Sequence, residues 1–161
     1  MPSTRVRPVE LDASDLKILA ILQRDNHTPQ RTIGEKINLS APAVQRRIKR
    51  LHETGVIRAN ICVVDPEEAG QWLTVLVNVD LESERAELID AAKATFLAET
   101  AVQQCYYVAG ETDFVLVLSV QSMGEYEALT RSLFFGNANV KRFRTFVAMD
   151  RVKVGLVVPL G

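Results

Sequence analysis

Apolar residues recur with a helical period near the start of the chain. The segment from Leu11 to about Asp25 is strongly apolar, and its period predicts a helix. Asp12 is placed to cap this helix at its N-terminus, and Leu11 can pack on Leu16 as a hydrophobic staple. We therefore expect a capped helix at the start of the first domain.

Two shorter helices follow, separated by a tight turn. Thr32 and Glu35 have the spacing of a capping box, which predicts that the second helix starts at Thr32. Asn-Leu-Ser at 38–40 ends it, and Ser40 caps the next helix. Pro42 is tolerated there because the first turn of a helix needs no intrahelical N–H. Two helices joined by so short a turn are typical of the helix-turn-helix motif.

The third helix has an apolar face and a cationic face. Val44, Ile48 and Leu51 form a stripe at helical spacing, and Gly55 is expected to end the helix in a left-handed conformation. The candidate DNA-binding residues lie at its N-cap and outside the stripe: Ser40, Pro42, Gln45, Arg46, Arg47, Lys49 and Arg50. In the major groove Arg reads guanine and Gln reads adenine, while other cations grip phosphate. A merely solvated basic face is the alternative, but the capping, the stripe and the short turn together favour DNA binding.

A strand is predicted directly after the third helix. Apolar residues alternate from Val56 to Val64, and the acidic turn at 65–68 follows. Three helices followed by a β-ribbon indicate a winged helix-turn-helix domain.

The second half of the chain alternates strands with helices. Strands are expected at 74–81, 102–109, 114–120 and 140–154, and helices at 84–98 and 122–135. The third strand is apolar on both faces, so it should be central and covered. Ser122 is expected to cap the second helix, with Glu125 completing a capping box. The order predicts an α+β, ferredoxin-like βαββαβ domain, with an antiparallel four-stranded sheet and both helices on one face.

The other face of that sheet would be left open. We assign five bulky residues to it: Tyr106, Tyr107, Phe143, Phe146 and Met149. An exposed apolar face of this size is a liability for a monomer, so we expect sheet-to-sheet dimerisation.

These patterns divide the chain into four parts: a mobile N-terminal arm at 1–10, a winged helix-turn-helix domain at 11–58, a wing and hinge linker at 59–72, and a βαββαβ dimerisation domain at 73–161, which becomes the dimerisation and effector-binding domain by the family resemblance described below. We interpret Arg5 and Arg7 of the arm as solvated cations, with contact to the DNA backbone as the alternative.

Charge is divided unevenly, although the net charge is only −1. Residues 1–60 contain 11 Lys and Arg against 6 Asp and Glu, whereas residues 61–161 contain 8 against 14. A basic N-terminal third beside an acidic remainder indicates one domain for a polyanion and a second domain for something else.

Several kinds of site and location find no support in the sequence. The apolar runs fall short of the roughly 18 residues that a membrane helix needs, and the first ten residues lack the apolar segment of a secretory signal. Cys62 and Cys105 are isolated, and His27 and His52 form no metal or catalytic set. We therefore expect a cytoplasmic, nucleoid-associated protein with no cofactor, no metal, no catalytic group and no membrane partner.

Five segments carry a family resemblance: LDASDLKILAILQRD at 11–25, SAPAVQRRIKRLHETGVI at 40–57, VVDPEEAG at 63–70, VAGETDFVLVLSV at 108–120 and VKRFRTFVAMDRVKVG at 140–155. In this order and spacing the chain resembles the Lrp/AsnC, or feast/famine, transcriptional regulators over nearly its whole length. The resemblance implies a hinge strand and a C-terminal domain that dimerises, assembles further (commonly to octamers) and binds a small effector, usually an amino acid. The chain departs from the family pattern at Ala59-Asn60, where Gly-Tyr is common, and in the loop at 26–31.

A dimer of this kind presents two recognition helices to double-stranded DNA. The operator should then be a pseudo-palindrome with half-sites about one helical turn, or a multiple of it, apart. Gln45 and Arg46 are the candidates for base contact. Lys49, Arg47 and Arg50 are candidates for phosphate contact or for pairing inside the domain, and a structural role for Arg50 is about equally open.

By resemblance, the loop after the second strand borders the effector site between neighbouring dimers. The candidate effector-binding residues are Tyr106, Gly110, Glu111, Thr112 and Asp113. Backbone N–H groups near Gly110 could hold a carboxylate, and Asp113 or Glu111 could hold an ammonium group. The alternative is that Gly110 and Asp113 only build a tight turn.

Two other classes of function stay open at this point. Sirohaem decarboxylases share the two-domain architecture without binding DNA, but both histidines of this chain lie in its first domain. A DNA-binding architectural protein without sequence preference is the other alternative. Of the three, we favour the transcriptional regulator, because the cationic helix is hard to explain in a decarboxylase.

Overall fold

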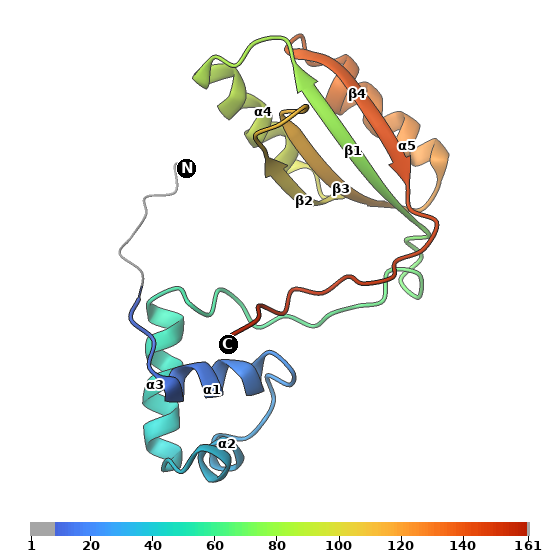
Figure 1. Cartoon of the computed structure of the whole chain (residues 1–161). Coiled ribbons are helices and arrows are strands. Elements are labelled where there is room, and N and C mark those ends of the chain that lie inside the picture. Colours follow the sequence, from blue (N-terminus) through green and yellow to red (C-terminus); the bar gives the residue numbers. More distant parts are fainter. Residues whose placement is uncertain (1–8, 161) are drawn as a thin grey trace. The chain divides into compact units, whose positions relative to one another are not determined.

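The computed structural model describes residues 9–160, which form two compact units (Figure 1). The first contains the described residues up to Cys62 together with the tail that starts at Gly155, and the second is Val63–Val154. The first unit is helical and the second is a sheet with helices, so the predicted α+β class is confirmed. Most of the expected N-terminal arm, including Arg5 and Arg7, lies outside the described residues.

Three helices make up the first unit: α1 (Ala13–Leu22), α2 (Gln30–Ile37) and α3 (Ala41–Glu53). Their apolar faces meet in one core of Ile18, Leu19, Ile33, Val44 and Leu51. Asp12 caps α1 as predicted, because its carboxylate accepts the Asp15 N–H at 2.9 Å. The Asp15 carboxylate in turn accepts the Asp12 N–H at 3.1 Å, which completes a capping box.

The predicted start of α2 was wrong. The helix begins two residues before Thr32, and Pro29 occupies its N-cap position with φ −59°. Because proline fixes φ near this value, it sets the entry to the helix without a side-chain cap. Glu35 therefore makes no capping box with Thr32 and instead pairs with Arg31, one helical turn earlier, at 3.0 Å.

The turn between α2 and α3 is as tight as predicted. Asn38 adopts the left-handed conformation with φ 57°, and the Ser40 hydroxyl accepts the Ala43 N–H at 3.4 Å. The backbone approaches closest at Gly34, where a Cβ atom would lie 2.3 Å from the Leu39 carbonyl oxygen. Only glycine fits at that position, so Gly34 is what permits the short turn.

The chain after α3 differs from the prediction. Gly55 is left-handed with φ 72°, as expected, but no strand follows among the described residues from Val56 to Trp72. Val56 and Ile57 pack against the helical core, and the Ile57 N–H bonds the Leu51 carbonyl at 3.0 Å. Their apolar character therefore reflects packing on α3, where the alternating pattern had suggested a strand.

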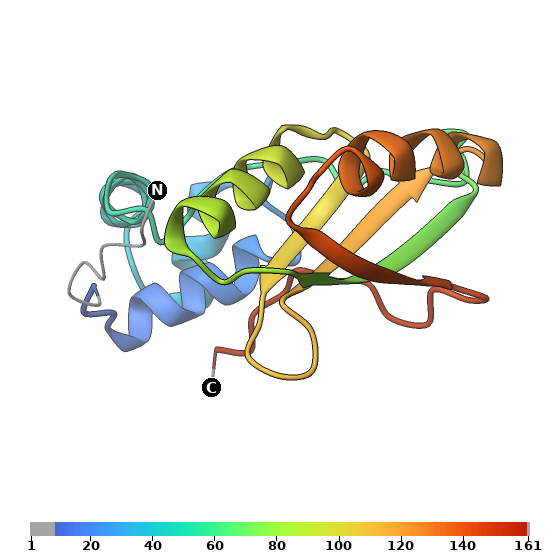
Figure 2. The same ribbon diagram turned by 90° about the horizontal axis from the view of Figure 1, so that it is seen from above.

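The second unit contains a four-stranded antiparallel sheet. Its elements in chain order are β1 (Leu73–Leu81), α4 (Ala86–Ala98), β2 (Val102–Tyr107), β3 (Phe114–Val120), α5 (Met123–Thr130) with its π-helical extension η1 (Arg131–Phe135), and β4 (Val140–Val147). The strand order is β2-β3-β1-β4, and both helices cover one face (Figure 2). The predicted ferredoxin-like arrangement is confirmed, with β3 in the interior of the sheet.

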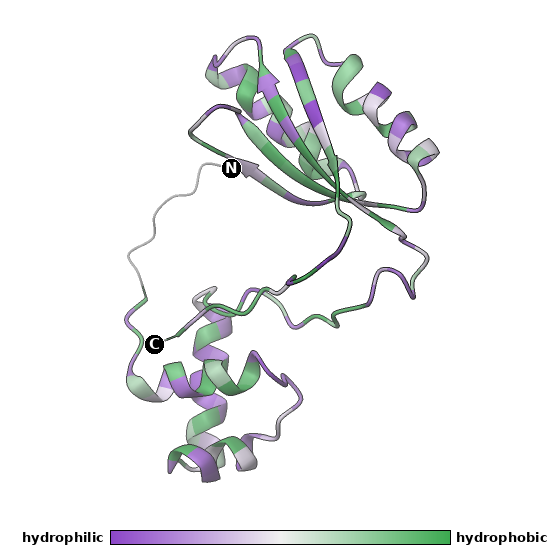
Figure 3. Cartoon of the chain, turned by 45° about the vertical axis from the view of Figure 1, so that its right-hand side comes forward, coloured by the Kyte–Doolittle hydropathy of each residue, from purple (hydrophilic) through white to green (hydrophobic). Residues whose placement is uncertain are grey.

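The core of this unit lies between the sheet and the two helices. In β1 the residues Val75, Val77 and Val79 are buried, and β3 presents Phe114, Leu116 and Leu118 to the same side. Apolar residues consequently run along the central strands (Figure 3). Ser122 caps α5 as predicted, with its hydroxyl accepting the Glu125 N–H at 3.2 Å. The Glu125 carboxylate, however, bonds the N–H of Gln121 and so does not complete the predicted capping box with Ser122.

The last strand is shorter than predicted. It ends at Val147, seven residues before Val154, because its partner β1 starts at Leu73 and pairs Val75 with Val147. A strand continues only while a neighbouring strand supplies hydrogen-bond partners. The chain therefore leaves the sheet at this point.

The tail beyond Gly155 belongs to the helical unit. The side-chain amide of Gln23 pairs with the backbone of Val158 in both directions: it donates to the carbonyl at 3.1 Å and accepts the N–H at 2.7 Å. Leu160 packs against the apolar core of the three helices. The described part of the tail, residues 155–160, thus belongs to the first unit.

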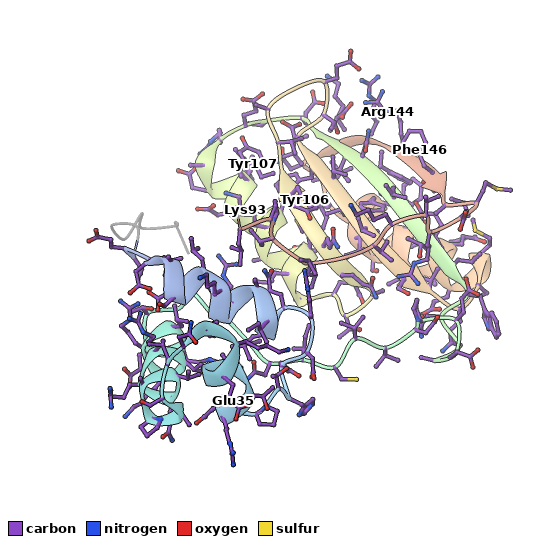
Figure 4. All side chains as sticks on the ribbon, turned by 60° about the horizontal axis from the view of Figure 1, so that its bottom comes forward. Glu35, Lys93, Tyr106, Tyr107, Arg144 and Phe146 are labelled. Carbon is purple, nitrogen blue, oxygen red and sulfur yellow. The ribbon has the colours of Figure 1, made fainter. Side chains whose placement is uncertain are left out.

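Strand register decides which bulky residues lie on the open face of the sheet. Phe146 and Tyr106 lie there, each 52% exposed (Figure 4). Phe143 and Tyr107 pair with residues of the covered face, so their assignment to the open face was wrong. Met149 lies beyond the end of β4 and is 97% exposed.

Candidate DNA interface and effector loop

Helix α3 is held by its apolar stripe and presents its polar side outward. Val44 and Leu51 are fully buried, whereas Gln45, Arg46 and Lys49 are exposed. Of the other predicted residues, Ser40 caps the helix and Pro42 is exposed in its first turn. The structure therefore brings the candidates for base contact together on the accessible side of the helix.

Arg47 and Arg50 are directed to α1. Arg47 donates from Nη1 to the Asp12 carboxylate at 2.7 Å and to the Asp15 carboxylate at 2.9 Å. Arg50 donates from Nη2 to the second oxygen of Asp15. Of the two roles left open by the sequence, pairing inside the domain is what the structure shows for both arginines.

The two carboxylates of this network are stabilised in their charged form. Burial by itself raises the pKa of Asp15, whose side chain is 1% exposed. Hydrogen bonds from the Asp12 N–H, Arg50 and Arg47 outweigh that effect and lower the pKa of Asp15 below its usual value. The pKa of Asp12 is also lowered, first by the Asp15 N–H and then by Arg47. The acidic groups therefore remain ionised at neutral pH.

An open hollow of about 370 Å³ lies over this network. Its lining is Asp12, Arg46, Arg47 and Arg50. Arg46, unlike its two neighbours, has no ion-pair partner within residues 9–160. Lys49 is paired only loosely with Glu53, at 3.7 Å on the exposed surface.

Asp15 was missed by the sequence reasoning, although one signal was available. It lies three and four residues before Ile18 and Leu19, on the buried face of α1. A carboxylate on an apolar face must be paired, and the paired arginines lie more than 30 residues away in sequence. The pattern could have shown that Asp15 needs a cation but not which one.

Two of the predicted effector residues are held against β1. The Asp113 carboxylate accepts the Leu81 N–H at 2.7 Å, and the Thr112 hydroxyl donates to the Val79 carbonyl at 3.0 Å. Gly110, with φ 158°, and Glu111 are exposed at the tip of the loop. These bonds fix the base of the loop between β2 and β3, which leaves its tip accessible.

Tyr106, the remaining predicted effector residue, forms its side-chain hydrogen bond within β2. Its hydroxyl donates to the Gln104 side chain at 2.8 Å on the open face of the sheet. Tyr107 instead turns to the covered side, where it contacts Phe114 and has the Lys93 ammonium 4.9 Å from its ring centroid (Figure 4). Only Tyr106 of this pair is therefore directed to the open face.

A second buried carboxylate was also missed. Asp80 of β1 is 8% exposed; it bonds Arg142 and lies 3.8 Å from the Arg144 guanidinium, both on the neighbouring strand β4. Burial raises its pKa, but the hydrogen bond from Arg142, together with the positive charges of Arg142 and Arg144, outweighs this and lowers the pKa of Asp80 overall. This cluster places charge on the open face of the sheet.

Metal sites and membrane-spanning helices are two further features on which the structure bears. Within residues 9–160, no three His, Cys, Asp or Glu side chains gather in a way that would hold a metal ion. No helix of the same region is long and apolar enough to cross a membrane.

Both units match known protein families. Residues 11–58 match a winged helix-turn-helix DNA-binding family, and residues 74–158 match the Lrp/AsnC ligand-binding domain. Together these matches cover the helical unit, the sheet and most of the tail. They assign DNA binding to the first unit and ligand binding to the second.

Individual relatives agree with these families. The chain is 40% identical over 152 residues to an uncharacterized HTH-type transcriptional regulator, y4tD, of Sinorhizobium fredii, covering 94% of this chain and 90% of the relative. It is 32% identical to the leucine-responsive regulatory protein of Haemophilus influenzae, covering 89% and 86%. The crystal structure of an AsnC family regulator from Agrobacterium tumefaciens superposes with a TM-score of 0.87 at 27% identity, covering 93% and 97%. The chain belongs to the Lrp/AsnC family of transcriptional regulators.

Proposed function

We propose that this protein is a sequence-specific DNA-binding regulator whose DNA affinity or assembly is modulated by a small effector, an amino acid. The observation that carries the proposal is the outward side of α3, where Gln45 and Arg46 are exposed and Arg46 has no ion-pair partner among the described residues. An unpaired guanidinium beside an amide suits the base edges of the major groove.

In this proposal the protein dimerises through the open face of its sheet. Tyr106 and Phe146 expose aromatic surface there, and pairing two such faces would bury it. A homodimer would carry two copies of α3 and bind a pseudo-palindromic operator. Dimers would assemble further, up to an octamer, as the family resemblance implies. The protein would be localised in the cytoplasm, in association with the nucleoid.

The effector is proposed to bind at the loop between β2 and β3. Gly110 and Glu111 at its tip are exposed, while the bonds of Thr112 and Asp113 to β1 keep the loop in one position. The ligand-binding family match of this unit supports a small-molecule site, and a relative named for its response to leucine supports an amino acid. Binding would change DNA affinity through assembly, with a coupling on the order of 1–3 kcal/mol.

The DNA half of the proposal is tested by operator selection followed by substitution. Duplexes selected from a random pool by the full-length protein should share a pseudo-palindromic sequence. Arg46→Ala should then weaken binding by about 1–3 kcal/mol and relax the preferred sequence. Lys49→Ala, the matched control on the same helix, should weaken all sequences alike and flatten the salt dependence. Identical behaviour of the two variants in gel shifts would contradict the assignment of Arg46 to base contact.

The effector half is tested by thermal shift against the twenty amino acids. At 100 times its dissociation constant, a ligand adds about 2.7 kcal/mol of stability, which raises the melting temperature visibly. The response should be lost in Asp113→Ala. A flat screen, together with operator affinity that no amino acid changes, would contradict the amino-acid effector.

The two alternative functions make different predictions. A protein that only organises DNA would select no shared sequence from the pool and would bind with salt dependence alone. A decarboxylase would have to bind a tetrapyrrole. The described histidines, His27 and His52, are both exposed in the helical unit, and the relatives are transcriptional regulators.

A further inference from the structure

We propose that Arg47 and Arg50 form a preassembled seat for one DNA backbone phosphate in each half-site, and that Asp15 is the positioning residue that holds the seat. The inference rests on the proposed function, because it assumes that α3 meets DNA. It assigns to these arginines a role distinct from that of Arg46, which lies beside them on the same helix.

Asp15 orients both arginines from within the helical unit. Its two oxygens are divided between them: Oδ1 accepts from Arg47 and Oδ2 accepts from Arg50. The side chain is 1% exposed, whereas those of Arg47 and Arg50 are 30% and 44% exposed. A buried carboxylate therefore holds two guanidinium groups whose outer parts reach the surface.

Each guanidinium keeps donors for a further partner. Arginine has five N–H donors on three nitrogens. Arg47 uses only Nη1, and Arg50 uses only Nη2. The remaining nitrogens of both have no hydrogen-bond partner in the part of the chain that the structure describes. A phosphate oxygen matches these donors because guanidinium groups bind phosphate in a bidentate fashion.

The positive charge in excess over the hollow belongs to Arg46. The lining contains three arginines and Asp12, and the carboxylates of Asp12 and Asp15 balance the charges of Arg47 and Arg50. Both carboxylates have a lowered pKa and stay ionised. Arg47 and Arg50 would therefore hold a phosphate through their unused N–H donors, with Arg46 as the nearby net charge.

The same ion pairs disfavour contact between these two arginines and the DNA bases. Arg47 and Arg50 are bonded to α1. Extending Arg47 into the groove would leave Oδ1 of Asp15 buried and unpaired, and extending Arg50 would leave Oδ2 with the Asp12 N–H as its remaining donor. Arg46 has no such tie. The structure thus separates one arginine that is free to reach bases from two that are fixed for the backbone.

Methylphosphonate scanning tests the seat directly. The full-length protein is titrated onto its selected operator, in which one phosphate at a time is replaced by an uncharged methylphosphonate. At one position in each half-site, the replacement should lower wild-type affinity about tenfold. At that position it should change the affinity of Arg47→Ala or Arg50→Ala less than about twofold, because the contact is already lost. Lys49→Ala, a matched loss of one cation from the same helix, should keep the full tenfold penalty.

Asp15→Asn distinguishes positioning from simple charge. It should reduce the same methylphosphonate penalty to below about threefold, although both arginines remain. If this variant does not fold, Arg50→Lys provides the test. It keeps the positive charge but loses the planar, bidentate N–H donors of arginine, and should reduce the methylphosphonate penalty by the same amount. The proposal is overturned if methylphosphonate substitution at every position weakens binding of the arginine variants as much as that of the wild type. It is also overturned if Lys49→Ala becomes insensitive to the methylphosphonate at the same position as the arginine variants. A wild-type protein that selects no operator would instead contradict the proposed function.

Discussion

The two units each contain an aspartate flanked by two arginines, but they complete the cluster differently. Around Asp15, both carboxylate oxygens accept hydrogen bonds from arginine. Around Asp80, one oxygen bonds Arg142, while Oδ1 is buried without a hydrogen bond, and Nε of Arg144 is likewise buried and unbonded. The Asp15 carboxylate is thus fully paired within the helical unit, whereas the Asp80 carboxylate is only half paired within the sheet unit.

The same set of one aspartate and two arginines is therefore fully hydrogen-bonded at its carboxylate in one unit and incompletely hydrogen-bonded in the other. A buried ion pair is tolerated when every polar atom is satisfied, and an incomplete cluster has polar atoms whose loss of hydration is not offset. The Asp15 cluster is therefore expected to contribute to folding of its unit. The Asp80 cluster lies on the open sheet face, where our proposed partner subunit would approach.

The largest effect should come from Asp15→Ala. The substitution removes the hydrogen bonds from two guanidinium groups and half of the α1 capping box, although the arginines themselves are partly exposed to water, so the helical unit should lose about 2–4 kcal/mol of unfolding free energy. Urea unfolding monitored by helical circular dichroism measures the loss. Asp90→Ala removes an exposed acid that pairs only with Lys93, and should cost no more than about 0.5 kcal/mol. Equal losses would mean that burial of Asp15 has no special consequence.

Asp80→Ala should cost less, about 1–2 kcal/mol, because one of its oxygens has no hydrogen bond to lose and Arg142 is already largely exposed to water. The same urea titration, with the sheet transition followed separately from the helical one, gives the value. A cost as large as that of Asp15→Ala would remove the contrast between the two clusters.

Acid should weaken the helical unit over a defined range. The folded-state pKa of Asp15 is depressed, so its contribution to stability is fully present above the unfolded value of about 3.9 and is lost as pH falls through the folded value. Melting temperatures measured in steps below pH 4 should fall for the wild type. They should fall less steeply for Asp15→Asn, which has no group to protonate there. Parallel curves would show that Asp15 is not the titrating group.

The smallest effect should come from Gln23→Ala, which removes the two hydrogen bonds to Val158 on the surface. We expect a loss of about 0.5–1 kcal/mol and faster proteolysis of the tail. Gln30→Ala replaces an exposed glutamine of the same unit and should leave tail cleavage unchanged. If both variants are cleaved alike, the Gln23 contact does not hold the tail.

Local capping and helical periodicity made much of the fold predictable. Asp12, Ser40 and Ser122 cap the helices as expected, since a cap depends on neighbours within three residues. The start of α2 was misplaced because the spacing of Thr32 and Glu35 fits a capping box, whereas the helix in fact begins at Gln30, directly after Pro29. Competing local signals of this kind are resolved only by the packing of the whole unit.

Strand faces were harder to predict than strand positions. The pairing of β2 with β3 shifts between Val102 and Gln104, and the pairing of β1 with β4 shifts between Asp80 and Leu81. A slip of one residue moves every side chain to the other face. Tyr106 and Tyr107 are adjacent in β2 and therefore point to opposite faces, so the alternation alone excludes the assignment of both to the open face. Which of the two lies there depends on register, which the sequence does not reveal.

The candidate site was predictable only in its exposed part. The positions of Gln45 and Arg46 follow from the helical period, since the apolar stripe defines the buried side of α3. The partners of Arg47 and Arg50 lie on another helix, 32 or more residues away, and no periodicity reports such a contact. Similarly, the bonds from Thr112 and Asp113 to β1 depend on sheet pairing.

The return of the tail to the helices has a consequence for how the protein can be dissected. In topological terms the sheet unit is an insertion: the chain leaves the helical unit after Cys62 and re-enters it at Gly155. A fragment cut at the linker would lose Leu160 from its core, so it would understate the stability of the intact helices. A reporter fused after Leu160 would sit beside α1 and therefore sense the helical unit, although it follows the ligand-binding domain in sequence.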